Sequence, residues 1–158
     1  MKLARTGIIA AAILAVSSVA FAQKPDFSGM WTPDAPAAAP GAGGGGGGRG
    51  MGGGPMTVKQ DATTLTIERT RGENKVVTTY KLDGTESINK QMMGQGNEVE
   101  LKSTAKWDGS KLVISTTRPG QDGTPQTSTE TWSMDGGALK IERTGGRGPS
   151  TTTYKKTT

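Results

Sequence analysis

The stretch that decides the fold is EVELKSTAKWDG, residues 98–109, in which two kinds of side chain alternate. Odd positions from 99 to 107 carry apolar or small side chains, while even positions carry charges or threonine. Strict alternation of this kind is typical of a half-buried antiparallel strand. Asp108-Gly109 is a strong hairpin signal, so Lys111–Arg118 is expected to be the return strand.

Similar strand signals occur along most of the chain. Runs of threonine, β-branched and aromatic residues are bounded by turn residues, which is the pattern of short strands at regular spacing. The chain is expected to form about eight or nine strands. Besides the hairpin above, the expected strands are Ser28–Thr32, Thr57–Gln60, Thr64–Arg69, Lys75–Leu82, Gln126–Met134, Ala138–Thr144 and Ser150–Lys156.

The chain also contains an internal repeat. LTIERT, residues 65–70, recurs as LKIERT, residues 139–144, and a tyrosine follows each leucine after fifteen residues, at Tyr80 and Tyr154. A looser copy has Leu112 followed by Trp132. Each unit predicts a hairpin with Leu and Ile on the inner face of one strand and an aromatic side chain on the other strand. Repeated hairpins make an all-β, antiparallel up-and-down meander, which tends to close because closure removes exposed edges.

The N-terminus has the pattern of a secretory signal peptide. Lys2 and Arg5 precede an apolar run, Gly7–Val19, and Ala20-Phe21-Ala22 supplies a cleavage site. We expect residues 1–22 to be removed and the protein to be periplasmic or secreted. The alternative is an uncleaved anchor helix. No cysteine follows the run, which argues against lipid modification, and no later apolar run is long enough for a transmembrane helix.

The chain after the signal peptide divides into three parts. Residues 23–34 form an N-terminal segment with the short first strand. Residues 35–55 are rich in Ala, Pro and Gly and are expected to be a flexible loop, because they contain too little apolar surface to offset the entropy of ordering. Residues 56–158 are expected to form the antiparallel β domain.

The segment Asp26-Phe27-Ser28-Gly29-Met30-Trp31 resembles the opening of a group of small exported bacterial proteins described as lipocalin-like. Those proteins continue with hairpins similar to Leu65–Arg69 and Lys106–Gly109, and they close with a segment similar to Tyr154–Lys156. The Gly-x-Trp tripeptide also begins the first strand in lipocalins. The resemblance implies a lipocalin-like barrel or half-barrel with Trp31 packed near its base.

The residue inventory argues against most catalytic chemistry. The chain has no His and no Cys, which removes Ser-His-Asp and Cys-His catalysis, His-ligated zinc and thiol redox chemistry. Glu68 and Glu142 alternate outward, opposite Leu and Ile, so they are expected to be solvated. A carboxylate-based hydrolase is therefore the least favoured function, and we expect no enzymatic activity and no cofactor.

Charge and methionine content argue against two kinds of partner. Without the signal peptide the formal net charge falls from +5 to +3, and the charges alternate instead of forming the basic face that nucleic-acid binding needs. Met51, Met56, Met92 and Met93 are expected in flexible or irregular segments, and the thioethers of such exported segments can bind Cu(I). Without His or Cys they are weak evidence, and no metal site is expected.

Six residues are candidates for a ligand site. Arg69 and Arg143 share the phase of the inner Leu and Ile residues, so each is expected to hold an anionic head group or to extend past the core into water. Aromatic residues on inner positions or beside turns either line a pocket or simply build the core. These aromatic residues are Tyr80, Trp107, Trp132 and Tyr154.

Two functions follow from these observations. The first is an exported, non-enzymatic protein that binds a small apolar or amphipathic ligand. The alternative is a structural or interaction protein of the envelope or matrix, with no small-molecule ligand and with exposed Thr-rich strands that contact envelope components. The first function predicts a cavity between the sheet faces, and the second predicts a filled interior.

Overall fold

The computed structural model of the protein describes residues 24–34, 54–71, 73–93, 97–120, 122–146 and 148–157. The expected signal peptide and nearly all of the expected Gly-rich loop lie outside these residues. Within the described ranges, no helix has the length and apolar character needed to cross a membrane.

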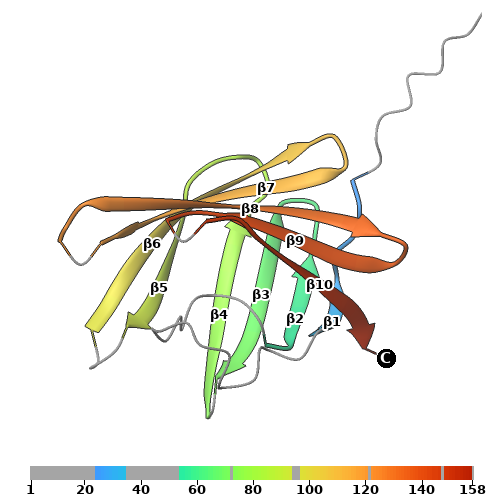
Figure 1. Cartoon of the computed structure of the whole chain (residues 1–158). Coiled ribbons are helices and arrows are strands. Elements are labelled where there is room, and N and C mark those ends of the chain that lie inside the picture. Colours follow the sequence, from blue (N-terminus) through green and yellow to red (C-terminus); the bar gives the residue numbers. More distant parts are fainter. Residues whose placement is uncertain are drawn as a thin grey trace, which may run out of the picture.

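The described chain folds into a single antiparallel sheet of ten strands that curls into a nearly closed barrel (Figure 1). Strands that follow one another in the sequence pair with one another, except β4 and β5, and β1 joins β2 on one side to β10 on the other. The expected meander fold is therefore confirmed. The strands are β1 (Gly29–Pro33), β2 (Met56–Gln60), β3 (Thr64–Arg71), β4 (Asn74–Lys81), β5 (Ser87–Met93), β6 (Asn97–Asp108), β7 (Lys111–Pro119), β8 (Pro125–Asp135), β9 (Ala138–Thr144) and β10 (Ser150–Thr157).

The internal repeat corresponds to equivalent cross-strand pairs. Leu65 on β3 lies opposite Tyr80 on β4, and Leu139 on β9 lies opposite Tyr154 on β10. In the looser copy Leu112 lies opposite Trp132. All three pairs belong to the core, so the inner position expected for these leucine and aromatic residues is confirmed.

The core consists of apolar side chains from most of the strands. Each of its members is no more than 8% exposed, so little of its apolar surface contacts water. The core residues are Phe27, Trp31, Met56, Val58, Leu65, Ile67, Tyr80, Leu82, Ala105, Leu112, Ile114, Trp132, Leu139, Ile141 and Tyr154.

The N-terminal segment is fixed to the core by Phe27 and Trp31. The Phe27 ring stacks on the Trp107 ring at a centroid distance of 5.8 Å. The backbone carbonyl of Phe27 accepts a hydrogen bond of 2.8 Å from Trp31 Nε1. Gln60 on β2 accepts a hydrogen bond from Phe27 N–H and donates one to the carbonyl of Pro25. Gly29 has a φ of 142°, a conformation that side-chain-bearing residues rarely adopt. The Gly-x-Trp tripeptide therefore has a structural basis.

Strand β5 was not predicted from the sequence, because its pattern is inverted. Its buried or half-buried positions carry the polar residues Ser87, Asn89 and Gln91, while its exposed positions include the apolar residues Ile88 and Met92. An alternating pattern of this kind gives no clear apolar face.

The placement expected for three of the methionines was wrong. Met56, Met92 and Met93 were expected in irregular segments, but Met56 begins β2 and is buried, and the other two lie in β5.

The two ends of the sheet, β4 and β5, meet along a seam that side chains close. Asn89 Oδ1 accepts a hydrogen bond of 2.9 Å from Thr79 N–H, and Asn89 Nδ2 donates one of 2.9 Å to the Thr79 carbonyl. Ser87 Oγ accepts a hydrogen bond of 2.8 Å from Lys81 N–H. These contacts lie near the turn that connects the strands, and the strands spread apart beyond it (Figure 1).

Candidate functional site

An ion pair joins two neighbouring strands on the inner side of the barrel. Glu130 on β8 and Arg143 on β9 are directly opposite in register, and Arg143 Nε donates a hydrogen bond of 2.8 Å to Glu130 Oε1. Trp132 Nε1 donates one of 3.0 Å to the other carboxylate oxygen. The side chains of Arg143 and Glu130 are 19% and 15% exposed. The pair is therefore largely removed from water. In such surroundings its charged hydrogen bonds are strong, and removing one partner is costly.

Tyr80 reaches the same region from β4. Burial raises the pKa of its hydroxyl above the ordinary value and the charge of Glu130 adds to this shift, while Arg69 and Arg143 act in the opposite direction. A hydrogen bond with Thr116 also lowers it. The hydroxyl thus stays protonated at neutral pH and is available as a neutral donor among charged groups.

Arg143 is held in its charged form. Burial alone would lower the pKa of its guanidinium, but Glu130 and then the Tyr154 hydroxyl outweigh this effect, and the pKa is raised. Tyr154 is buried beside Arg143, on the strand that pairs with β9. Arg143 is therefore a permanent positive charge in the barrel interior.

Arg69 provides the second positive charge, and it is less well satisfied. Its Nη2 donates a contact of 3.2 Å to the sulfur of Met56, its neighbour in register on β2. A thioether sulfur is a weak acceptor. Arg69 Nε is buried and has no hydrogen-bond partner among the residues that the structure describes. An unsatisfied buried donor of a charged group costs about 1–3 kcal/mol or more, so this atom is the natural place for an added acceptor.

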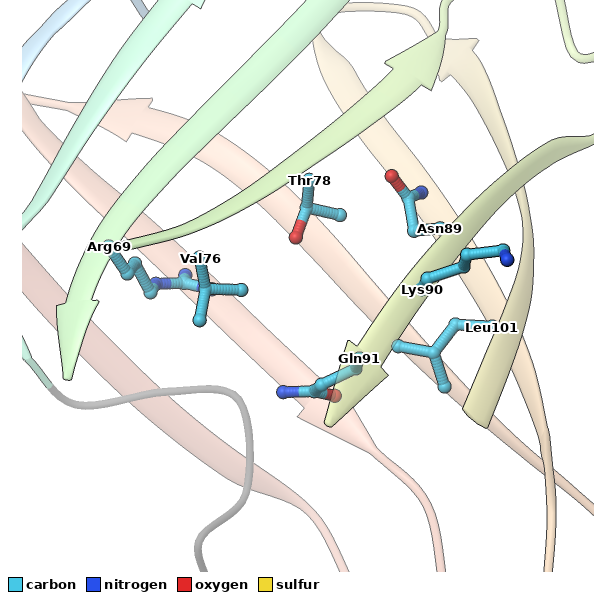
Figure 2. Close-up of a pocket in the computed structure, with 7 residues that line it drawn as sticks. All are labelled: Arg69, Val76, Thr78, Asn89, Lys90, Gln91 and Leu101. Atoms are coloured by element: carbon cyan, nitrogen blue, oxygen red, sulfur yellow. The ribbon is translucent and has the colours of Figure 1, made fainter. Parts of the chain in front are cut away.

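A small recess lies between β4 and β5, next to Arg69 (Figure 2). Its free volume is about 10 Å³, roughly the space of one water molecule. Gln91 points into the gap from β5, and Arg69 extends toward Val76 from β3 (Figure 2). The recess is lined by Arg69, Val76, Thr78, Asn89, Lys90, Gln91 and Leu101. It is far smaller than the pockets of about 300–1,000 Å³ that usually enclose small-molecule ligands.

The structure brings five of the six predicted site residues into two adjoining groups. Arg69, Arg143 and Glu130 all act electrostatically on Tyr80, while Trp132 and Tyr154 are core residues that interact with Glu130 and Arg143 respectively. The sixth residue, Trp107, packs elsewhere. Its ring stacks on Phe27, and the Nζ atom of Lys24 lies 5.6 Å from the ring centroid.

The sequence interpretation did not single out three polar residues of the interior, Glu130, Ser103 and Thr116. Ser103 Oγ and Thr116 Oγ1 share a buried hydrogen bond of 2.8 Å. Alternation alone places Glu130 in phase with Trp132, so the position was predictable although the ion pair was not. Across the described ranges, no group of three or more His, Cys, Asp and Glu side chains is arranged to hold a metal ion.

No protein-family model and no curated protein matches the chain. Solved structures match its fold. Secretory abundant heat soluble protein 4 from Ramazzottius varieornatus is 20% identical, with a TM-score of 0.54, over 83% of this chain and 94% of that one. Apo lipid binding protein 8 from Caenorhabditis elegans is 11% identical, with a TM-score of 0.50, over 65% and 70% of the two chains. At these identities the likeness shows the fold alone.

Proposed function

We propose that the protein is an exported, non-enzymatic binding protein for a small amphipathic molecule with an anionic head group. The observation that carries the proposal is the charge balance around Tyr80, where the charges of Arg69, Arg143 and Glu130 all act on the buried hydroxyl and Glu130 is paired with Arg143. Among the residues that the structure describes, Arg69 has no carboxylate within ion-pair distance, and its Nε has no acceptor. An anionic oxygen would supply both.

The arrangement favours an anion over a neutral ligand. Removing a charge from water is costly unless it is paired, so a buried guanidinium gains most from a charged acceptor. Tyr80 provides a neutral hydroxyl nearby to complete the hydrogen bonding of a carboxylate. The name of the C. elegans protein of similar fold, which describes it as lipid binding, supports an amphipathic ligand. Export, to the periplasm or beyond, rests on the signal-peptide pattern of residues 1–22.

The proposal is tested by titrating the purified protein with decanoate, below its micelle-forming concentration, in a calorimeter. Arg69→Gln is expected to weaken binding by roughly tenfold or more, because it removes a charged hydrogen bond. Lys59→Gln is the matched control. It removes the same charge from a side chain that is 67% exposed, and it should leave binding unchanged. Equal effects of the two substitutions, or no binding to the wild-type protein, would contradict the proposal.

A second candidate function is an envelope or matrix interaction protein. It is favoured by the apolar part of the barrel, where buried side chains of the described strands pack into one core cluster. Cross-linking in intact cells of the source organism tests it. A reproducible cross-linked partner would support this function, and recovery of monomer alone would leave it without support.

A further inference from the structure

Exposed apolar side chains gather at the seam between β4 and β5. Val77 on β4 is 47% exposed, and Ile88 and Met92 on β5 are 57% and 66% exposed. Met30 on β1 is the other large hydrophobic residue found exposed in the described chain. Three of these four side chains therefore flank one seam, and the inverted pattern of β5 is what turns two of them outward.

The same seam leads inward to Arg69, whose Nε has no hydrogen-bond partner among the described residues. The hydrogen bonds that close it involve Thr79 and Lys81, near the connecting turn. Farther along the strands the recess contains Arg69 from inside the barrel and Gln91 from β5 (Figure 2). An anionic group that enters the recess from outside meets Arg69 without passing through the core.

The apolar side of the interior is occupied by packed core side chains of the described strands. Leu65, Trp132, Leu139 and Tyr154 are fully buried and pack together at the apolar side of the interior. A ligand chain placed there would have to displace them, and replacing close packing by a cavity or by strain is costly. A chain that lies on the outer face has no such barrier, because Val77, Ile88 and Met92 already present apolar surface to water.

We propose that the ligand binds with its head group inside and its chain outside. The anionic head group enters between β4 and β5 and pairs with Arg69, and a single apolar chain lies along the outer face over Val77, Ile88 and Met92. The ligand class is a single-chain carboxylate. The inference rests on the proposed function, since it assigns the two ends of the same ligand to two parts of one site.

The first test compares carboxylates of increasing chain length, from hexanoate to dodecanoate, all below their micelle-forming concentrations. Affinity for the wild-type protein is expected to rise with each added methylene. The double variant Ile88→Thr with Met92→Thr is expected to flatten this dependence while hexanoate binding stays. Val113→Thr, on β7 and away from the seam, is the control and should keep the wild-type dependence. An unchanged dependence in the double variant would overturn the outer chain site.

The second test locates the chain with a carboxylate that has a nitroxide at its far end. Paramagnetic broadening in NMR spectra is expected at the amides of Val77, Ile88 and Met92. Broadening centred on Leu65 and Leu139 would overturn this inference while leaving the proposed function intact, because the ligand would then lie within the core. Absence of binding by every carboxylate would overturn both the inference and the proposed function.

Discussion

Arg143 and Glu130 lie directly opposite each other on β9 and β8, and the 2.8 Å hydrogen bond between them crosses the inner side of the barrel. Trp132 Nε1 donates a hydrogen bond to the second carboxylate oxygen of Glu130. One acidic side chain thus links a charged group to the aromatic core, and the polar and apolar parts of the interior meet at this point.

Glu130→Ala is expected to be strongly destabilising. It leaves the Arg143 guanidinium and the Trp132 N–H without their acceptor in a largely buried position, which should cost about 3–5 kcal/mol of unfolding free energy. Urea unfolding measures the loss. Glu142→Ala, which breaks the exposed pair with Lys140, is the control and should cost less than about 1 kcal/mol. Similar losses for the two variants would show that the inner pair has no special role.

Asn89→Ala is expected to open the seam locally without unfolding the barrel. The Thr79 amide loses its acceptor, so its hydrogen exchange should become much faster, while the global free energy of unfolding falls by only about 1 kcal/mol. NMR-detected exchange measures both. Thr66→Ala, which removes an exposed hydroxyl contact with Thr79 but no backbone bond, serves as the control. Unchanged protection of Thr79 in Asn89→Ala would mean that water does not reach the seam.

Phe27→Ala is expected to cost about 3–5 kcal/mol, because a fully buried ring is removed. Phe27 contacts both Trp107 and Trp132, so the tryptophan emission of the folded variant should also change. Met30→Ala is a control three residues away and on an exposed position, with an expected effect within about 0.5 kcal/mol. Thermal unfolding followed by fluorescence distinguishes the two.

Asp61 is expected to make stability depend on pH in the acid range. Hydrogen bonds from the side chain of Thr64, and then from the backbone and side-chain groups of Thr63 and Thr64, hold the pKa of Asp61 well below its ordinary value of 3.8. The stabilisation is complete above that value and is lost as the pH falls below it. The urea midpoint should therefore decline less steeply below pH 4 in Asp61→Ala than in the wild-type protein. Parallel curves would contradict this assignment.

Local patterns predicted most of the fold but not all of it. The Asp108-Gly109 turn and the leucine–aromatic repeat define hairpins, because both depend on residues close in sequence. Strand β5 escaped prediction because Ser87, Asn89 and Gln91 face the seam and the interior, where hydrogen bonds to the neighbouring strand are needed more than apolar packing. That need arises only from the three-dimensional closure of the sheet.

Only part of the candidate site was predicted, because the rest depends on how the whole sheet curves. The phase of Arg69 and Arg143 relative to their leucine and isoleucine neighbours correctly indicated side chains that turn inward. Glu130, which pairs with Arg143, lies on another strand. No local sequence pattern indicates which acidic residue will lie close to the arginines. The group around Tyr80 is likewise set by the curvature of the whole sheet, which brings β4 near β8 and β9.

The pairing of β1 with β10 closes the barrel between two strands that lie far apart in the sequence. Thr32 and Thr157 share a hydrogen bond of 2.8 Å although 125 positions separate them. A growing chain cannot form this contact until Thr157 has been synthesised, and contacts between distant residues form slowly. The topology therefore delays closure of the barrel until β10 is available to pair with β1. A protein shortened by one strand would expose the edges of β1 and β9 to neighbouring molecules and should aggregate.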